Sequence, residues 1–469
     1  MLPVAFLKTR KLPVIIFLFL LCFGGCCVPV EKRYQAAPSL LPGTNRMMKT
    51  AGFWIGRHPD PDRVFLDPGQ IEKLNGYLQA ELGLTRDMLA SDQSMSQEEI
   101  RSLLDEDMRN FTGPACYDKD GLAAGADFFD SLYGNMNLEN IPPRVPPRFA
   151  LVTRYADQRV FPTAESLYGT RGDRDFDAVQ TSALDIGTPL RILHESRDQA
   201  WVYVFDPLYR GWVENNRVAP ASREDLERFL RPEKRAVVIS PKGDLYRDPK
   251  RTVHHDHARM GVSFPLAGDD GGNGDGVVLL LPFRREDGSL CIEKAYASEA
   301  EVHRGFLALT GRHMLEQAFR LVNAPYGWGG RNGEQDCSRF VQEVFATAGV
   351  RLPRNSSKQA EAGLLLDRFD GGTPAERKIA ILAERALGGL TLLYMKGHIL
   401  LYAGHVDGVP YAVHALWGYR ERTWGGDRVR VTGRVVLSDL TLGKGTKKGS
   451  LLERLVSVRM LSPVDTPFL

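Results

Sequence analysis

Cysteine is scarce in this chain of 469 residues, which contains six. Three lie within the first 30 residues, and Cys116, Cys291 and Cys337 are spread over more than 200 residues. Small disulfide-stabilised proteins carry more cysteines at closer spacings. The sequence therefore excludes a disulfide framework, and an isolated thiol favours a catalytic explanation if the chain is exported.

An excess of charge of one sign is also absent, because 60 basic residues accompany 58 acidic residues. No basic stripe runs along the chain, so nothing indicates nucleic-acid binding. The composition, 43% apolar and 25% charged, is that of a folded protein rather than a disordered or multi-span membrane chain. The length predicts about three domains, and the 46 Gly and 28 Pro indicate many turns, as small β-barrels need.

No apolar run reaches the ~20 residues that span a bilayer. The longest, residues 12–23, follows three basic residues and precedes two glycines and Cys26, which is typical of an export signal. The letters FGGC resemble a bacterial lipobox, although Phe23 and Cys27 depart from the usual pattern. The resemblance implies that Cys26 carries a lipid anchor that holds the protein to the membrane of a bacterial cell envelope. Plain secretion is the alternative.

Composition changes along the chain predict its domain organisation. A polar, proline-containing start resembles a tether, and the Pro-rich stretch at 141–148 can continue neither a helix nor a sheet. Helical periodicity precedes that stretch, and short alternating runs follow it. We expect a signal peptide (1–25), a tether (26–50), a helical N-terminal domain (51–145), two small β-domains (146–222 and 223–302) and a C-terminal domain (303–469).

The most informative stretch is PYGWGGRNGEQDCSRFVQEVFATAGVRLPR, residues 325–354. Asp336 can cap a helix whose apolar positions mark one buried face that ends near Gly349. Cys337 then lies at the helix N-terminus, where free amide groups and the helix dipole stabilise a thiolate. We expect Cys337 to be a nucleophile with a lowered pKa, and the alternative is a buried structural cysteine.

Three histidines follow on two expected strands, in HILLYAGHVDGVPYAVHA. If residues 406–408 form a three-residue hairpin loop, His414 faces Leu400. His398 and His414 are then diagonal neighbours on one face, about 7 Å apart. His405 lies an odd number of positions from His398 and should point to the opposite face. A two-residue loop would shift the register and separate the pair.

These residues predict thiol-based acyl chemistry. Cys337 attacks an acyl carbon, His398 accepts the thiol proton and returns it to the leaving amine, and His414 orients His398. Tyr326 and the Cys337 amide are candidates to hold the developing oxyanion.

The C-terminal domain resembles the NlpC family of bacterial cell-wall cysteine peptidases, whose motifs read here as Tyr326–Gly330, Asp336–Gln342, His398–Tyr402 and Val413–Ala415. The resemblance implies a circularly rearranged papain-like α+β domain that works without a cofactor. It also implies hydrolysis of the γ-D-glutamyl to diamino acid bond in peptidoglycan stem peptides. One departure is Arg339, where the usual motif has glycine, which adds bulk and charge beside the nucleophile.

The runs at 190–193, 201–204 and 211–213 resemble strands of the bacterial SH3-like module, so we expect two SH3-like β-barrels before the catalytic domain. A branch of the family with this domain order resembles nearly the whole chain after the signal. It implies that the first barrel helps close the site and that substrates with a free N-terminal L-Ala are preferred. In that branch an acid and a hydroxyl beside the nucleophile hold the substrate amine. The resemblance assigns these roles to Asp336 and Ser338, although Asp336 could be a helix cap only. Trp328 is a further candidate for lining the cleft.

Other functions are compatible with the same residues. The protein could be an inactive peptidoglycan-binding lipoprotein, but the presence of Cys337, His398 and His414 together argues against a decayed site. An amidase or acyltransferase on the same fold would use the same three side chains. The HHDH letters at 254–257 offer zinc ligands, but adjacent histidines rarely converge on one ion, so we expect no metal site.

The lipobox generates a direct test. We expect incorporation of a radiolabelled lipid precursor to depend on Cys26, because the modified thiol must follow the two glycines. Cys26→Ser should abolish labelling, with Cys27→Ser as the matched control that retains it. Labelling that persists in the Cys26 variant would show that another residue is modified.

Overall fold

The computed structural model describes residues 34–90, 92–111, 116–268 and 276–461. The expected signal peptide, Cys26 and the start of the tether lie outside these residues. Within the described part of the chain, no helix is long and apolar enough to cross a membrane.

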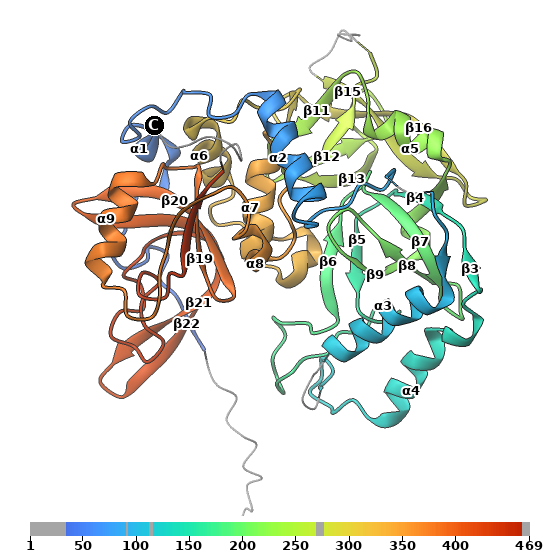
Figure 1. Ribbon diagram of the computed structural model, residues 1–469, viewed down its shortest axis with the longest axis horizontal. Helices are drawn as coiled ribbons and strands as arrows, with labels where there is room; N and C mark the ends of the chain where they lie inside the picture. Colours follow the sequence, from blue (N-terminus) through green and yellow to red (C-terminus); the bar gives the residue numbers. More distant parts are fainter. Residues whose placement is uncertain (1–33, 91, 112–115, 269–275, 462–469) are drawn as a thin grey trace, which may run out of the picture. The chain divides into compact units, whose positions relative to one another are not determined.

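A seven-stranded sheet and its helices form the C-terminal part of the chain (Figure 1). Its strands are β18 (Leu364–Arg368), β19 (Thr391–Met395), β20 (His398–Val406), β21 (Val409–Thr423), β22 (Gly426–Asp439), β23 (Ser457–Met460) and β1 (Gln35–Ala36). Its helices are α6 (Gly311–Arg320), α7 (Cys337–Ala346), α8 (Ser356–Gln359) and α9 (Ala375–Arg385), with the 3-10 turn η4 (Trp328–Gly333). The order is β1-β22-β21-β20-β19-β23-β18, in which only the β1–β22 pair is parallel.

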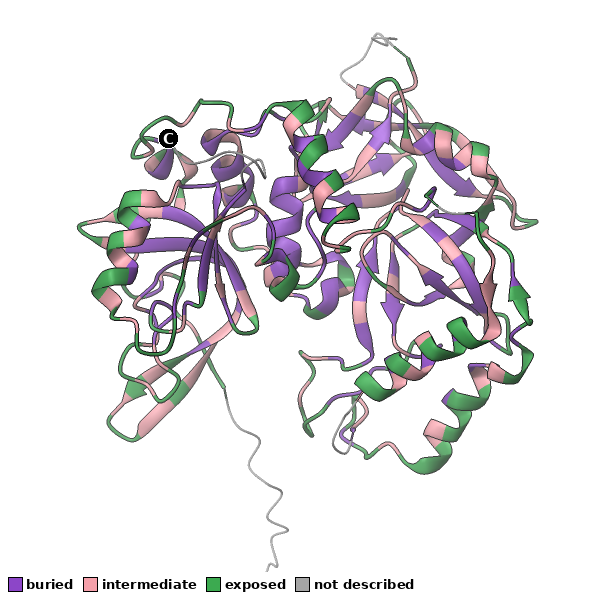
Figure 2. Cartoon of the chain, in the orientation of Figure 1, coloured by how far each residue is buried: buried purple, intermediate pink, exposed green. Residues whose placement is uncertain are grey.

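Helix α7 occupies the centre of the fold. Its apolar side packs on β20 and β21, and its other side contacts the SH3-like strands through Arg339. Eight of its ten residues are buried, whereas the helices α3 and α4 described below leave much of their surface exposed (Figure 2).

The tether and the first helices belong to the C-terminal core, which corrects the expected boundaries. Strand β1 pairs with β22, and the 3-10 turn η1 (Met47–Lys49), α1 (Ala51–Ile55) and α2 (Pro68–Ala80) follow. Trp54 and Leu74 are buried in the same apolar cluster as Phe340 and Leu400. The chain from residue 34 onward is therefore not a free tether.

The remaining N-terminal helices join a different core. The elements are β2 (Met95–Ser96), α3 (Gln97–Asn110), α4 (Ala126–Asn135), the 3-10 turn η2 (Leu138–Asn140) and β3 (Arg144–Val145). Ile100 and Leu132 pack against Trp201 and Trp212 of the SH3-like strands. The described helices of the expected domain at 51–145 therefore pack into two different cores, because helical periodicity identifies a buried face but not its partner.

The first β-domain forms a sheet in the order β10-β4-β7-β8-β9-β5-β6. Its elements are β4 (Arg148–Val152), β5 (Ala156–Arg159), β6 (Gln180–Leu184), β7 (Pro189–Glu195), β8 (Trp201–Phe205), β9 (Arg210–Glu214), η3 (Asn215–Arg217) and β10 (Val218–Ala221). The expected strands at 190–193, 201–204 and 211–213 lie within β7, β8 and β9. A closed barrel is not confirmed.

The second β-domain consists of two smaller sheets around one apolar core. After α5 (Arg223–Leu230), β11 (Arg235–Val238), β14 (Ser263–Pro265) and β17 (Val302–Arg304) form one sheet. The other contains β12 (Lys242–Tyr246), β13 (His254–Arg259), β15 (Gly276–Arg284) and β16 (Leu290–Ser298). Here too the structure shows sheets, and the expected barrel is not confirmed.

One buried arginine joins the three parts of the chain. Arg259, at the end of β13, is fully buried and forms a bidentate ion pair with Asp185 of the first β-domain. Its Nε also lies 3.9 Å from an oxygen of Glu343 on α7. Removal of one partner from such a pair leaves an uncompensated buried charge.

We therefore expect Arg259→Met to destabilise the protein by about 3–5 kcal/mol, because Asp185 and Glu343 lose their shared cation. Lys358→Ala, which removes an exposed ion pair with Glu361, should cost less than about 1 kcal/mol. Urea unfolding followed by circular dichroism measures both. Equal midpoints for the two variants would show that Arg259 does not hold the domains together.

Candidate active site

The candidate nucleophile is the first residue of α7. The Asp336 carboxylate accepts a hydrogen bond from the backbone N–H of Arg339, so the expected helix cap is present. The Cys337 sulfur accepts hydrogen bonds from the backbone N–H groups of Ile399 and Ser338. Burial and the Asp336 charge nevertheless raise the pKa of the Cys337 thiol to about 12. The expected lowering of this pKa is therefore wrong, and the thiol is protonated at neutral pH.

A chain of hydrogen bonds extends from His398 into the sheet. Nε2 of His398 lies 2.7 Å from Nδ1 of His414, and Nε2 of His414 lies 2.9 Å from the Ser438 hydroxyl on β22. A hydrogen on Nε2 of both rings satisfies these contacts and leaves Nδ1 of His398 as the free acceptor. The thiol contacts the backbone amide of Ile399, the residue after His398.

Both imidazoles are held in the neutral state. Burial, followed by the positive charges of Arg454 and Lys448, lowers the pKa of His398 to about 3. Burial and the adjacent His398 ring hold the pKa of His414 well below its ordinary value. Both side chains are therefore neutral, and the His398 imidazole is able to accept a proton.

A two-residue loop and a β-bulge in the β20–β21 hairpin together bring His398 next to His414. Its loop has only two residues, 407–408, both with positive φ. A β-bulge at residues 402–404 adds one residue to the first strand. On the far side of the bulge from the loop, Leu401 pairs with Val413, which is the pairing that a three-residue loop at 406–408 would give. The expectation that a two-residue loop separates the histidines is therefore wrong, because the bulge compensates for it.

His405 lies near the loop end of this hairpin and is exposed. Its Nδ1 is 3.3 Å from the Tyr402 hydroxyl. The bulge interrupts the alternation of side chains, so the odd spacing from His398 does not determine its face. Its place at the loop end, rather than strand alternation, keeps it out of the His398–His414 pair.

Sequence reasoning missed two residues of the site. Ser438 is 24 residues from His414 and reaches it only through the β21–β22 pairing. Arg354, in the RLPR stretch after α7, forms a buried ion pair with Asp336 at 2.5 Å. A buried carboxylate at the start of a helix needs a cationic partner. The arginine 18 residues after Asp336 could have indicated this ion pair from the sequence.

The expected amine-holding residues form one buried network. Oδ1 of Asp336 accepts hydrogen bonds from the Ser338 hydroxyl, the Arg339 amide and Nη1 of Arg354. Among the residues that the structure describes, Oδ2 accepts one hydrogen bond, from Nη2 of Arg354. Arg354 also donates to the hydroxyls of Ser338 and Ser182. Asp336 is thus ionised, with its pKa held low against burial by Arg354.

Arg339 connects α7 to the first β-domain. Its guanidinium donates to the Ala183 carbonyl at 2.7 Å and contacts the Ser182 hydroxyl at 3.3 Å, both on β6. Burial and the adjacent Arg259 and Arg354 charges lower its pKa to about 10. The Arg339 side chain, which replaces the glycine of the usual motif, therefore lies in the interface between α7 and the first β-domain.

Aromatic rings from two domains meet beside the nucleophile. Burial, followed by the charge of Asp336, raises the pKa of the Tyr326 hydroxyl. Phe176, from the β5–β6 connection, makes edge contacts with Tyr326 and the partly exposed Trp328. Phe176 also contacts Trp417. The first β-domain thus borders the site.

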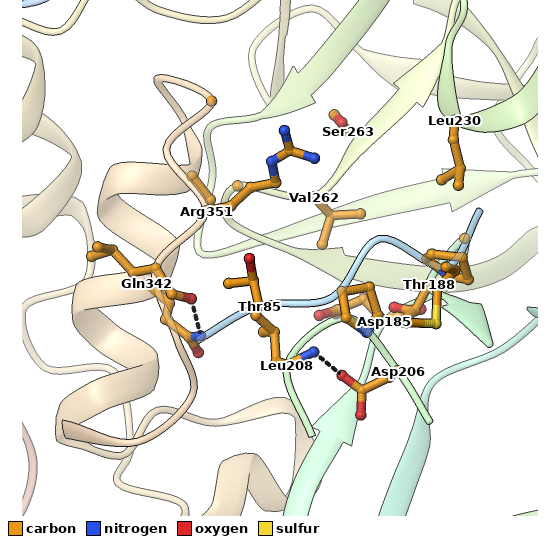
Figure 3. A pocket seen from close by; sticks show the side chains of 18 of the residues that line it. Thr85, Asp185, Thr188, Asp206, Leu208, Leu230, Val262, Ser263, Gln342 and Arg351 are labelled. Carbon is orange, nitrogen blue, oxygen red and sulfur yellow. Dashed lines mark hydrogen bonds between the residues drawn. The ribbon is translucent and has the colours of Figure 1, made fainter. Parts of the chain in front are cut away.

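A separate cavity of about 760 Å³ lies where the domains meet. Figure 3 shows Gln342 of α7 on one side and Asp185, Thr188 and Asp206 of the first β-domain on the other. None of Cys337, His398, His414, Tyr326, Asp336, Ser338 and Trp328 lines it. The cavity is therefore distinct from the candidate active site.

The HHDH letters lie on β13. His254 contacts Asp244 at 3.3 Å, and the His255 ring packs against Phe283. Among the residues that the structure describes, no three His, Cys, Asp or Glu side chains gather as metal ligands would.

Family comparisons agree with this organisation. Residues 166–214 match the model of the SH3 domain of SH3b1 type, and residues 323–411 match that of the NlpC/P60 family. The second match includes Cys337 and His398 but ends before His414.

Two curated bacterial relatives match part of the chain. The bifunctional muramidase/DL-endopeptidase CwlT of Bacillus subtilis is 41% identical over 73 residues, 13% of this chain and 22% of the relative. A probable endopeptidase of Corynebacterium glutamicum is 27% identical over 122 residues, 26% of this chain and 49% of the relative. The chain thus spans less than half the length of either.

A solved structure matches nearly the whole chain. The NlpC/P60 endopeptidase of Photobacterium damselae subsp. piscicida is similar over 92% of this chain and 100% of that chain, with a TM-score of 0.73 and 21% identity. This similarity extends the shared fold to the N-terminal helices and the second β-domain. An SH3 domain of SH3b1 type therefore precedes an NlpC/P60 domain in this chain.

Proposed function

We propose that this protein is a cysteine endopeptidase that cleaves peptidoglycan stem peptides. One observation carries the proposal: the Cys337 thiol contacts the backbone amide next to His398, whose ring is hydrogen-bonded to His414. A thiol, a base and a group that orients the base are the parts that acyl transfer from an amide requires.

The reaction begins from neutral partners. As the Cys337 sulfur attacks the amide carbon, Nδ1 of His398 takes the thiol proton, and its Nε2–H donates to His414. The proton then passes to the leaving amine as the C–N bond breaks, which leaves a thioester on Cys337. Water, deprotonated by His398, hydrolyses that thioester and restores the thiol.

The oxyanion is held at the start of α7. The backbone N–H of Cys337 and the Tyr326 hydroxyl donate hydrogen bonds to the oxyanion, and the positive end of the helix dipole adds to the stabilisation. The raised pKa of Tyr326 keeps its hydroxyl protonated and able to donate.

The proposed scissile bond joins γ-D-glutamate to a diamino acid, in peptides with a free N-terminal L-Ala. The name of the Bacillus subtilis relative includes DL-endopeptidase activity, which supports this bond. The substrate amine is held beside Ser338 and at Oδ2 of Asp336, which accepts one hydrogen bond from the described residues, that of Arg354. Trp328 and Phe176 border the site where the substrate chain would enter.

The site of action is the bacterial cell envelope. Peptidoglycan lies outside the cytoplasm, and the first 26 residues have the basic, apolar and small-residue order of an export signal. Lipidation of Cys26 would hold the domains at the membrane, where cell-wall fragments can be trimmed or recycled.

We expect Cys337→Ala and His398→Ala each to reduce hydrolysis of L-Ala-γ-D-Glu-diamino acid peptides by more than about 10⁴-fold, because each removes an essential part. Ser438→Ala should cost about tenfold, because His414 loses the contact that fixes its tautomer. His405→Ala, the matched control, should stay within about twofold of the original protein. Product masses from each variant measure these rates and separate an endopeptidase from an amidase or acyltransferase.

The proposed amine contact makes a second prediction. The free peptide L-Ala-γ-D-Glu-diamino acid should be cleaved at least about tenfold faster than its N-acetyl form, because acetylation removes the ammonium charge and adds bulk. The measurement is kcat/KM on both peptides with the original protein. Asp336→Asn is unsuitable as the main test, because it also breaks the ion pair with Arg354. Equal rates would contradict the amine site.

A further inference from the structure

The β21–β22 hairpin ends in a fully exposed tryptophan. Thr423 pairs with Gly426, so Trp424 and Gly425 form the two-residue loop at its end. Figure 1 shows that this hairpin extends beyond the other strands of its sheet. The Trp424 side chain is completely exposed and adds nothing to the core. A single exposed apolar residue is common, but tryptophan is favoured where protein meets a lipid interface, so the surroundings of Trp424 decide its role.

Basic side chains gather behind Trp424. Residues 420–430 and 444–448 together contain seven basic and two acidic residues. The second segment lies against the first, because the Lys447 amide donates a hydrogen bond to the Asp427 carboxylate at 2.7 Å. The end of the hairpin therefore carries a net positive charge.

The basic side chains occupy both faces of the hairpin. Arg422 lies opposite Asp427, and Glu421 lies opposite Arg428. Residues directly opposite each other share a face, and successive residues of a strand point to opposite faces. Arg420 and Arg422 therefore lie on one face and Arg428 on the other, and all three are exposed. Positive charge on both faces favours an end-on approach to an anionic surface.

The first described strand runs along this hairpin and enters from its tip. Strand β1 pairs in parallel with β22, with Gln35 opposite Arg430. Because β22 starts beside the tip and runs away from it, β1 also runs away from the tip. Oε1 of Gln35 accepts hydrogen bonds from Nη1 of Arg428 and Nη1 of Arg430 at 3.1 and 2.8 Å. The chain therefore enters the fold on the side of the tip.

The expected lipid anchor lies within reach of the same end of the hairpin. Cys26 lies eight residues before Tyr34, and a chain of this length spans at most about 29 Å. The tip is six residues from Arg430 along β22, or about 20 Å. A lipid on Cys26 would therefore hold this end of the hairpin close to the bilayer.

We propose that the tip of the hairpin, which consists of Trp424, Arg420, Arg422, Arg428 and Lys447, docks on a membrane surface that contains anionic phospholipids. The inference rests on the envelope location in the proposed function and names the surface of the folded chain that meets the membrane. Trp424 enters the layer between headgroups and acyl chains, and the basic side chains contact lipid phosphates. Peptidoglycan is the competing occupant, and the direction of β1 favours the membrane.

Docking at the tip would set the height of the candidate active site above the bilayer. Trp417 lies seven residues before Trp424 on β21, about 23 Å along an extended strand. Its ring contacts Tyr34 and Phe176, and Phe176 borders the site. A lipid anchor alone leaves the orientation of the folded chain free, whereas a second contact at the tip fixes it.

The test uses residues 28–469, which contain every described element and no cysteine of the lipobox. Cosedimentation measures binding to vesicles made of equal parts phosphatidylcholine and phosphatidylglycerol, and to vesicles of phosphatidylcholine alone. We expect binding to the anionic vesicles to be at least about tenfold tighter, because several basic side chains contribute. Added salt should weaken it.

Variants of the tip assign the contact. Trp424→Ser should weaken binding to the anionic vesicles by about tenfold, and Arg420→Gln and Lys447→Gln by about fivefold each. The matched controls Leu122→Ser and Arg228→Gln change an exposed apolar and an exposed basic residue outside the hairpin, and each should stay within about twofold.

Fluorescence locates the ring in the bilayer. Lipids brominated on their acyl chains should quench tryptophan emission when the original protein binds. Trp424→Phe keeps an aromatic ring and should still bind, but the quenching should disappear. Melting temperatures show that the variants are folded, and their hydrolysis of soluble stem peptides should stay within about twofold of the original rate, because the tip does not contact the reacting groups.

The absence of binding to anionic vesicles, equal binding to both vesicle types, or unchanged binding of the Trp424→Ser variant would each overturn the inference. A loss of binding to isolated sacculi in that variant, with vesicle binding unchanged, would assign the tip to peptidoglycan and also overturn it. None of these results bears on catalysis, so the endopeptidase proposal would stand. Failure of the original protein to cleave soluble stem peptides would overturn the proposed function and leave the vesicle result intact.

Discussion

A buried ion pair at the start of α7 supports the rest of the site. Arg354 holds the Asp336 carboxylate, and Asp336 in turn caps the helix that begins at Cys337. The same guanidinium reaches Ser338 and the Ser182 hydroxyl of the SH3b domain. This charged contact thereby fixes the N-terminal end of α7 and, together with Arg339 and Arg259, holds it against the neighbouring domain.

The electrostatics of the site keep both reacting groups uncharged. Burial raises the pKa of Cys337 to about 12 and lowers that of His398 to about 3, so transfer of the proton at rest is strongly unfavourable. An exposed thiolate would react with any oxidant or electrophile. A protonated thiol that is only half-exposed is less open to these reactions.

Local features of the fold could be predicted from the sequence. The cap at Asp336 and the apolar face of α7 depend on residues within about one helix, and patterns of that range are visible in the chain. The contact of His398 with His414 was also predictable, although the bulge that permits it was not. Bulges depend on local backbone geometry that side-chain alternation does not encode.

Contacts between distant elements could not be predicted in this way. The pairing of His414 with Ser438 depends on the register of a third strand, and periodicity in α2 shows that Leu74 is buried without showing that it packs with the C-terminal core. Arg339 illustrates the same limit, because its neighbour in sequence is the nucleophile and its partner in space is Ala183.

The parallel pairing of β1 with β22 joins the two ends of the described chain. Gln35 contacts Arg430, 395 residues later, and Trp54 enters a core made mostly of residues beyond position 309. Such long-range contacts slow folding, since a large loop must close before they form. During synthesis the first part of the chain must therefore wait, without its apolar partners, until nearly the last strand has been made. A fragment limited to the NlpC/P60 region would never receive those partners and would expose the apolar surface that they cover.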